Sequence, residues 1–339
     1  MKSKPPGAKN ITKFSMLSTN KKPTCWVVSN GWAGTEKQCV ALAQALGLSF
    51  SLKRVKLRFP WNILPECLWF FPLKAYSAKG DQLSPPWPDI LISSGRSTSA
   101  VTAAIKRQDK NVFTIQIQDP RLPARWFDAV IVPQHSGVKG KNVIQTLGAL
   151  HGLNAGLLEP AKEEWRSTFE PLKGPRVAVI IGGNSGYYHM TEAWAQIFVA
   201  KLEKLLQTGA SLMITLSRRT PPFFLSILKP LLQSPQVFCW QGQGSNPYLG
   251  ILSWADHLVV TSDSVSMITE ACSLQKPVYV EALTPKQKWR PCRLEGFRKN
   301  LEAKGYILPF QGHLAADPPA GFNDLPMIVA QLRKLKIPL

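Results

Sequence analysis

The sequence of 339 residues contains no apolar run near the roughly 18 residues that a membrane-spanning helix requires. Its six cysteines form no C-x-x-C pair, and most of them fall inside apolar segments. This spacing disfavours a metal site, a redox dithiol and a disulfide framework, and it favours buried thiols in a reducing cytosol. With 45% hydrophobic and 9% aromatic residues, the composition is that of an ordinary globular protein long enough for two domains.

Acidic residues are scarce. Asp and Glu number 21 against 41 Lys and Arg, which gives a formal net charge of +20. The imbalance is larger in residues 1–150, with 21 basic and 7 acidic residues, than in residues 151–339, with 20 and 14. Such an excess indicates an anionic partner, whether nucleic acid, an anionic membrane surface or a phosphorylated substrate. No nucleic-acid recognition motif accompanies the charge, so we expect no nucleic-acid partner.

The order of predicted elements indicates two domains of one class. Residues 1–23 carry six lysines and no acid, and we expect a disordered basic leader rather than a secretory signal. From residue 24 onward, short apolar strands alternate with amphipathic helices, and the pattern restarts near residue 176. This alternation predicts right-handed βαβ connections and parallel sheets. We therefore predict an α/β protein with two Rossmann-like doubly wound domains, residues 24–165 and 166–339, the C-terminal helix being a candidate to pack back on the first.

Polar residues are concentrated where a predicted strand of the second domain turns into a helix, in "TSDSVSMITEA" (261–271). One N-cap residue would be enough for this helix, yet the stretch offers Ser262, Asp263, Ser264 and Ser266, with a lone Glu270 further on. In doubly wound sheets ligands bind beyond the carboxyl ends of the strands, and helix amides there favour an anion. The alternative is a heavily capped helix with Glu270 on its solvent face.

Two more strand ends of the second domain carry candidate phosphate contacts. Arg218 and Arg219 follow a strand directly before "TPP", and arginine suits bidentate phosphate recognition. Gly182, Gly183 and Asn184 follow the first strand of this domain. A glycine pair permits close backbone approach, as in phosphate loops, but a tight turn explains it nearly as well.

The first domain offers candidates for a general base. Gly31 and Gly34 bracket its first strand-to-helix turn, where Glu36 either complements the helix dipole or faces an acceptor. Asp119 lies in "QDPR" and His135 in "PQHS", each at a predicted strand end. Histidine has the most suitable intrinsic pKa, but a lone histidine is more often structural. We rank the candidates Asp119, Glu36, His135.

Several motifs occur in one order: "GWAGTEKQ" (31–38), "QDPR" (118–121) with "FDAVIVPQH" (127–135), "IGGNSG" (181–186), "SRRTP" (217–221) and "TSDSVSMITEA" (261–271). Together they resemble the family named for the plant mitochondrial-fission, elongated-mitochondria protein. The resemblance implies a GT-B glycosyltransferase-like fold, in which two Rossmann-like domains face each other across a cleft that holds a nucleotide-sugar. It also implies that bacterial members act in surface-glycan assembly of the lipopolysaccharide type, and that the plant member recruits a dynamin.

The resemblance further implies roles for individual residues. Ser262, Ser264 and the helix amides would hold the diphosphate of the nucleotide-sugar donor, and Glu270 would accept from the ribose hydroxyls. No tightly bound cofactor and no metal are implied. One departure concerns the end of this helix, where GT-B donor domains often show Gly-x-Pro and this sequence has "QKP" (275–277). A non-glycine residue there costs ~1 kcal/mol if its backbone must be left-handed.

Residues 53–79 combine six basic residues and one acid with aromatic segments broken by prolines. Trp61, Trp69, Phe70 and Phe71, flanked by Lys and Arg, are typical of a segment that docks at a membrane interface. Ordinary core packing is the alternative for the aliphatic residues of this segment. A docking segment would suit a transferase whose acceptor is a lipid-linked glycan.

Three hypotheses for function follow. The leading one is a metal-independent GT-B glycosyltransferase, peripheral on the cytoplasmic face of the inner membrane, that uses a nucleotide-sugar. A second is a non-catalytic recruiting or binding protein on a GT-B scaffold. A third is a nucleotide-sugar epimerase, which would differ from a transferase in forming product without an acceptor.

Overall fold

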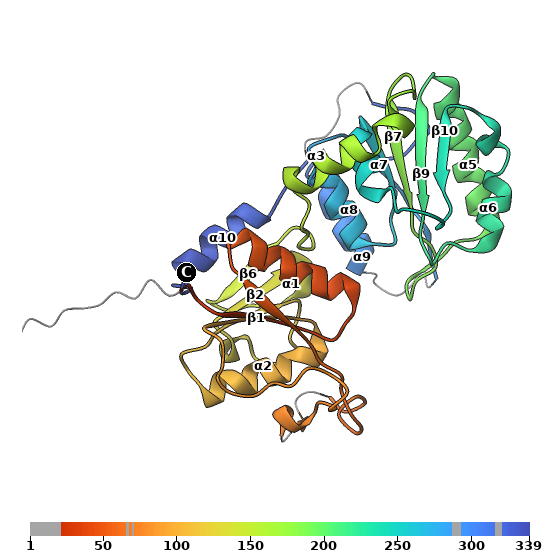
Figure 1. The fold of residues 1–339 in the computed structure, drawn as a ribbon. Helices are drawn as coiled ribbons and strands as arrows, with labels where there is room; N and C mark the ends of the chain where they lie inside the picture. The colour runs from red at the N-terminus through yellow and green to blue at the C-terminus, as the bar shows by residue number, and fades with distance from the viewer. Residues whose placement is uncertain (1–21, 66–67, 70, 287–292, 316–320) are drawn as a thin grey trace, which may run out of the picture.

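The computed structural model describes residues 22–65, 68–69, 71–286, 293–315 and 321–339. It has two lobes, each built on a six-stranded parallel sheet with helices on both faces (Figure 1). The predicted α/β class with two doubly wound sheets is therefore confirmed. The predicted basic leader lies almost entirely outside the described residues. Within the described residues, no helix combines the length and the apolar character that crossing a membrane would need.

The first sheet has the strand order β2-β1-β3-β4-β5-β6, and all neighbouring strands are parallel. All residues of β3 and β4 are buried, as expected for central parallel strands that are covered on both faces. The strands are β1 (Cys25–Ser29), β2 (Phe50–Arg54), β3 (Ile90–Ser94), β4 (Phe113–Ile117), β5 (Ala129–Pro133) and β6 (Val143–Thr146).

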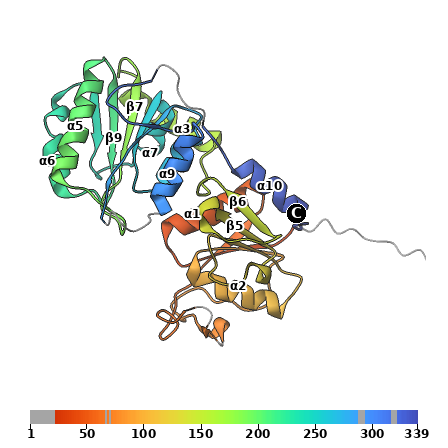
Figure 2. The ribbon, with the colours of Figure 1, turned by 180° about the vertical axis from the view of Figure 1, so that it is seen from behind.

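Helices from both ends of the chain cover the first sheet. Val27 packs in one core with Leu42 of α1 and Ile328 of α10. Its neighbour Val28 points to the other face and packs with Ile105 of α2, as the two-residue period of a strand requires. Figures 1 and 2 both show α10 beside β6, so the end of the chain returns to the first domain. The helices are α1 (Ala33–Ala45), α2 (Arg96–Gln108), α10 (Leu325–Lys334) and the short 3-10 helices η2 (Pro72–Lys74), η3 (Ala124–Trp126) and η4 (Gln134–Ser136).

The second sheet has the order β10-β9-β7-β11-β12-β14, again parallel throughout. A separate antiparallel pair joins β8 (Tyr188–His189) and β13 (Thr284–Pro285). The strands of the large sheet are β7 (Arg176–Ile181), β9 (Ser211–Leu216), β10 (Val237–Trp240), β11 (His257–Thr261), β12 (Val278–Glu281) and β14 (Leu308–Pro309).

The two faces of the second sheet carry separate cores. Val179 packs with Phe198 of α5 on one face, and Ala178 packs with Ile268 of α8 on the other. Figure 1 shows α5 and α6 together on one side of β7, β9 and β10. The helices are α3 (Ala155–Glu164), α4 (Arg166–Phe169), α5 (Glu192–Gln207), α6 (Pro222–Leu228), η5 (Leu231–Gln233), α7 (Tyr248–Trp254), α8 (Val265–Cys272) and α9 (Arg293–Ala303).

Each sheet has a point where the strand order reverses. In the second sheet β7 lies between β9 and β11, and in the first sheet β1 lies between β2 and β3. Connections leave such a point toward opposite faces, so a crevice opens at the carboxyl ends of the strands. Gly182 directly follows β7, and Asp263 lies two residues after β11. The predicted phosphate-binding loops therefore meet at the crevice of the second domain.

Of residues 53–79, the first two end β2, and the described ones among the rest connect β2 to β3 at the lower end of the first lobe, beyond α2 in both views (Figures 1 and 2). Trp69 is only 6% exposed, and its indole N–H donates to the carbonyl of Leu64 at 3.1 Å. The prediction that Trp69 enters a membrane interface is therefore wrong, because its ring belongs to a small core. Phe70 lies outside the described residues, whereas Phe71 is 63% exposed.

Candidate functional site

A cavity of about 270 Å³ lies where the two domains meet. The first domain contributes Gln38 of α1 and Asp119 after β4, and the second contributes Ser266 of α8. The contact between domains is close, since a Cβ added to Gly148 would overlap the side chain of Thr269. The Thr269 hydroxyl also accepts the backbone N–H of Ala149 at 3.2 Å. Helix α8 is therefore docked on the first domain, with its first turn at the cavity.

Two of the residues predicted to bind the nucleotide-sugar, Ser264 and Ser266, lie partly buried at the start of α8. The hydroxyl of Ser264 caps the helix by accepting the backbone N–H of Met267 at 3.4 Å. Ser266 lines the inter-domain cavity. Glu270 follows Ser266 by four residues, so the two side chains share one face of the helix. Of the hydroxyl groups at the start of α8, that of Ser266 is therefore the one at the cleft.

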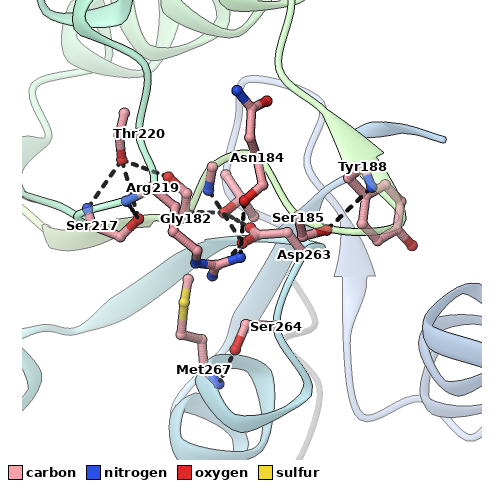
Figure 3. Close-up of polar contacts among 12 residues, drawn as sticks. Gly182, Asn184, Ser185, Tyr188, Ser217, Arg219, Thr220, Asp263, Ser264 and Met267 are labelled. Carbon is pink, nitrogen blue, oxygen red and sulfur yellow. Dashed lines mark hydrogen bonds and ion pairs between the residues drawn. The ribbon is translucent and has the colours of Figure 1, made fainter. Parts of the chain in front are cut away.

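Asp263 is the centre of a buried network, shown in Figure 3. Its Oδ2 accepts from the guanidinium Nη2 of Arg219 at 2.7 Å and from the backbone N–H of Gly183 at 3.2 Å. Its Oδ1 accepts the hydroxyl of Thr261 at 2.7 Å. The carboxylate is 0% exposed while the Arg219 side chain is 42% exposed. Asp263 therefore holds Arg219 in place, and the Arg219 side chain remains partly exposed.

The loop after β7 packs against the same network. A Cβ at Gly182 would overlap the Asp263 carboxylate, and one at Gly183 would overlap the carbonyl of Arg219. The side-chain oxygen of Asn184 accepts the backbone N–H of Met190 at 2.9 Å. The glycine pair thus does permit close approach, but the approaching groups belong to neighbouring loops of the same domain.

Ser262 has a structural role as well. Its side chain is buried, and its hydroxyl accepts the backbone N–H of Leu283 at 2.9 Å. This bond ties the loop after β11 to the loop after β12. A contact between Ser262 and a diphosphate conflicts with this burial, as does one for Asp263. Of the residues predicted to contact the diphosphate, Ser266 lines the inter-domain cavity and Arg218 and Arg219 are exposed.

Glu270 does not lie on an open solvent face. The hydroxyl of Tyr248, at the start of α7, donates to Glu270 Oε2 at 2.5 Å. Burial raises the pKa of Glu270, while the hydrogen bond from Tyr248 and the charge of Lys37 on α1 act in the opposite direction. Because Lys37 belongs to the first domain, the Glu270 carboxylate lies at the junction of the two domains.

The three candidate bases have different surroundings. Glu36 accepts from Arg54 at 2.9 Å (Nε) and 2.8 Å (Nη2), and this pairing lowers the pKa of Glu36. Asp119 lines the inter-domain cavity, and its Oδ1 accepts the backbone N–H of Arg121 at 2.9 Å. His135 lies in η4 after β5, and its side chain is outside the described part of the structure. Of the two carboxylates, Asp119 is the one that lines the inter-domain cavity, and its Oδ2 also pairs with Arg121 Nε at 3.4 Å.

The two glycines predicted at the first strand-to-helix turn of the first domain differ in conformation. Gly31 has a left-handed backbone (φ 82) that turns the chain out of β1, and Gly34 lies exposed in the first turn of α1. Sequence reasoning missed Tyr248, because a tyrosine at a helix start gives no sign of a partner on another helix. It also missed Gln118, which lines the cavity and has a left-handed backbone (φ 69). Among the described residues, no group of three His, Cys, Asp or Glu is arranged to hold a metal ion.

Comparison with known sequences identifies close relatives. The family profile described as Mitochondrial fission ELM1 matches residues 33–335. The mitochondrial fission protein ELM1 of Arabidopsis thaliana is 30% identical, and the match covers 84% of this chain and 84% of that protein.

Comparison with solved structures identifies the fold. A Listeria monocytogenes protein assigned as a UDP-N-acetylglucosamine 2-epimerase superposes with a TM-score of 0.55 at 12% identity, covering 93% of this chain and 88% of that chain. The UDP-GlcNAc 2-epimerase of Methanocaldococcus jannaschii, solved with UDP-GlcNAc and UDP, superposes with a TM-score of 0.50 at 12% identity, covering 92% and 99%. These matches confirm the predicted GT-B-like fold.

Proposed function

The chain belongs to the mitochondrial fission ELM1 family, and we propose that it binds a nucleotide-sugar between its two domains and transfers the glycosyl group to an acceptor hydroxyl. One observation carries this proposal. The inter-domain cavity brings Asp119 of the first domain to the first turn of α8, which carries Ser266 and, one turn later, Glu270. A transferase needs an acceptor base and a donor clamp on opposite sides of one cleft.

The donor side would use charge and helix geometry together. Glu270 would accept hydrogen bonds from the ribose hydroxyls, with Tyr248 holding its carboxylate. Ser264, Ser266 and the amides of α8 would contact the diphosphate. Because the Methanocaldococcus enzyme was solved with UDP-GlcNAc and UDP, uridine nucleotides are the first donors to test.

The transfer step would then proceed as follows. The acceptor oxygen attacks the anomeric carbon, the bond from that carbon to the diphosphate oxygen breaks, and Asp119 takes the acceptor proton. Negative charge develops on the departing diphosphate. Arg219, held by Asp263, and the exposed Arg218 would stabilise that charge, since arginine remains protonated and binds phosphate oxygens in pairs.

The acceptor would be a lipid-linked glycan at an anionic membrane surface. We define the docking loop as the described residues 56–65, 68–69 and 71–74, in which Phe59, Ile63, Leu68 and Phe71 are exposed apolar side chains. Cations accompany them, because Arg58 lies over the ring of Trp61 and Lys74 over that of Phe71. Exposed apolar groups among cations match the interface of a bilayer with anionic lipid headgroups.

Two alternatives belong to the same scaffold. Epimerisation is the activity named for the superposed Listeria and Methanocaldococcus proteins. Recruitment without catalysis is favoured by the pairing of both carboxylate candidates with arginines, Glu36 with Arg54 at 2.8 Å and Asp119 with Arg121 at 3.4 Å.

A panel of UDP-, GDP-, ADP- and CMP-sugars tests the proposal, first for binding by calorimetry and then for turnover with and without membrane extracts as acceptor. Nucleotide release that depends on acceptor supports transfer. Sugar isomerised without acceptor supports the epimerase, and saturable binding without turnover supports a recruiting protein. If the parent chain binds every nucleotide-sugar of the panel no more tightly than Glu270→Ala does, the cleft is not a nucleotide-sugar site and the proposal fails.

A further inference from the structure

A second hollow lies at the opposite end of the second sheet from the cleft. Arg176, the first residue of β7, and Asp256, which directly precedes β11, line a cavity of about 480 Å³. Because β7 has six residues and a strand rises about 3.3 Å per residue, this cavity is roughly 20 Å from Gly182. It adjoins another of about 450 Å³ that shares Lys162 and Lys276. Neither contacts the proposed nucleotide site.

Cations dominate the lining. Lys162, Arg176 and Lys276 face the cavity together with a single carboxylate, Asp256. Asp256 accepts the backbone N–H of Arg176 at 2.8 Å and pairs with its Nε at 3.4 Å, so it offsets one of the three charges. Two of the cations also lie over the buried ring of Trp254, Lys162 at 5.6 Å and Arg176 at 5.1 Å from its centroid. The ring holds positive charges close together without neutralising them.

Lys276 is partly buried. Its Nζ donates to the carbonyls of Leu252 and Ser253 at 3.0 and 2.9 Å, at the C-terminal end of α7. An ammonium group has three N–H donors, so these two bonds leave a third. Burial, with the charges of Lys162 and Arg176, lowers the pKa of Lys276 to about 8, although Asp256 acts in the opposite direction.

The residue before Lys276 has a strained backbone. Gln275 has φ 55, a left-handed conformation that glycine adopts without strain. Its side chain lines both cavities. Strained non-glycine residues persist where the surrounding structure fixes them, often at ligand sites, and here an exposed glutamine borders a cationic hollow.

We propose that this hollow, the Lys276 pocket, binds a small phosphate-bearing anion through Lys162, Lys276 and Arg176, with the carboxamide of Gln275 as a neutral donor. A phosphate group accepts several charge-assisted hydrogen bonds at once. The negative charge of the phosphate would compensate the charges of Lys162 and Lys276, because Asp256 pairs with Arg176. The pocket serves as a second ligand site, independent of the cleft between the domains.

Calorimetric titration of the full-length chain with inorganic phosphate, at constant ionic strength set with sodium chloride, tests this site. We expect saturable binding that weakens at least tenfold in Lys276→Met and in Lys162→Met. Asp256→Asn keeps an oxygen for the Arg176 N–H but loses the charge, so it should tighten binding. Lys204→Met removes an exposed positive charge from α5 of the same domain and should bind like the parent.

The dependence on pH gives a second readout. The charged groups that face Lys276 are Lys162 and Glu159 on α3, Arg176 at β7 and Asp256 before β11. Phosphate binding should weaken between pH 7 and pH 9 as Lys276 loses its proton, and Lys276→Met should lose that dependence. Because Lys276 also caps α7, the thermal unfolding of Lys276→Met is measured as a control for its folding. If Lys276→Met does not fold, the phosphate affinity of Lys162→Met tests the proposal.

Three results would overturn the proposal. One is the absence of saturable phosphate binding by the parent chain. Another is equal weakening by Lys204→Met, which would reduce the effect to net charge. The third is binding that survives both pocket variants and disappears in Arg219→Ala, which would place the phosphate in the inter-domain cleft.

Discussion

Arg219 and Asp263 form a 2.7 Å ion pair that joins the loop after β9 to the loop after β11. The carboxylate is fully buried and its other oxygen is bonded to Thr261, whereas the guanidinium is partly exposed. One arginine therefore stabilises the crevice and presents positive charge to it. The adjacent Arg218 is exposed and lies outside this pair.

Substitution of the two arginines should change the free energy of unfolding to different extents, but both substitutions should lower turnover. Arg219→Ala leaves the Asp263 carboxylate buried without its cation, and because the arginine is partly solvated we expect a loss of about 2–3 kcal/mol, less than for a fully buried pair. Arg218→Ala should stay within about 0.5 kcal/mol of the parent. Both should lower turnover more than nucleoside affinity. Thermal unfolding and steady-state kinetics measure these effects, and equal stability of the two variants would contradict the assigned pair.

Glu270→Ala should weaken nucleotide binding by about 1–3 kcal/mol, the scale of hydrogen bonds to a charged group. Since burial raises the pKa of Glu270, its carboxylate takes up a proton at a higher pH than an ordinary glutamate. Affinity should therefore fall as the pH drops through that raised pKa, and Glu270→Gln should abolish this dependence. Calorimetry at neutral and mildly acidic pH measures it. Parent-like affinity in Glu270→Ala would remove Glu270 from the donor site.

Asp119 and Glu36 provide a matched pair for the catalytic base. Asp119→Asn should lower turnover by about 10²–10⁴-fold, the range for loss of a general base, with nucleotide affinity kept. Glu36→Gln should change turnover far less, because Glu36 is held by Arg54 and its pKa is lowered. Single-turnover assays, with a nucleotide-sugar from the panel that the parent chain turns over, decide between the two carboxylates. A larger loss in Glu36→Gln would reverse the assignment.

The docking loop should bind liposomes through two separable contributions. Binding should require anionic lipid and fall at high salt, because cations act within a Debye length. The double variant Phe59→Ser/Phe71→Ser should bind liposomes more weakly by about 2 kcal/mol, because it loses apolar contact with the bilayer. This loss should be the same at every salt concentration, and the thermal stability of the variant should equal that of the parent. Ile197→Ser, which changes a 60% exposed apolar position on α5, is the control in sedimentation. Parent-like sedimentation of the double variant would exclude the loop as the docking surface.

Gln275→Gly should stabilise the chain by up to about 1 kcal/mol, because φ 55 is strained for glutamine and natural for glycine. Ser273→Gly, two residues earlier in a right-handed helical conformation, should destabilise it instead. Chemical denaturation measures both. A destabilised Gln275→Gly would mean that the glutamine side chain contributes more than its backbone strain costs.

Local patterns in the sequence determined the class of fold. Apolar strands such as "CWVVS" and "RVAVII" and the amphipathic segments between them specify βαβ units, because burial of one face follows from the period of each element. The connection rules then direct every loop after a strand to the same edge of a sheet. The location of Glu270, Arg219 and Asp119 at strand ends or in the helices that follow them was predictable for that reason.

Tertiary structure alone decided what each polar or aromatic side chain does there. Asp263 and Arg219 are 44 residues apart, and Tyr248 and Glu270 are 22 apart, so no local pattern could join them. Trp69 is buried and Phe71 is exposed although they share one aromatic segment. Burial and hydrogen bonding are properties of pairs brought together by the whole chain, and they separate a group that holds the fold from one that is left to meet a ligand.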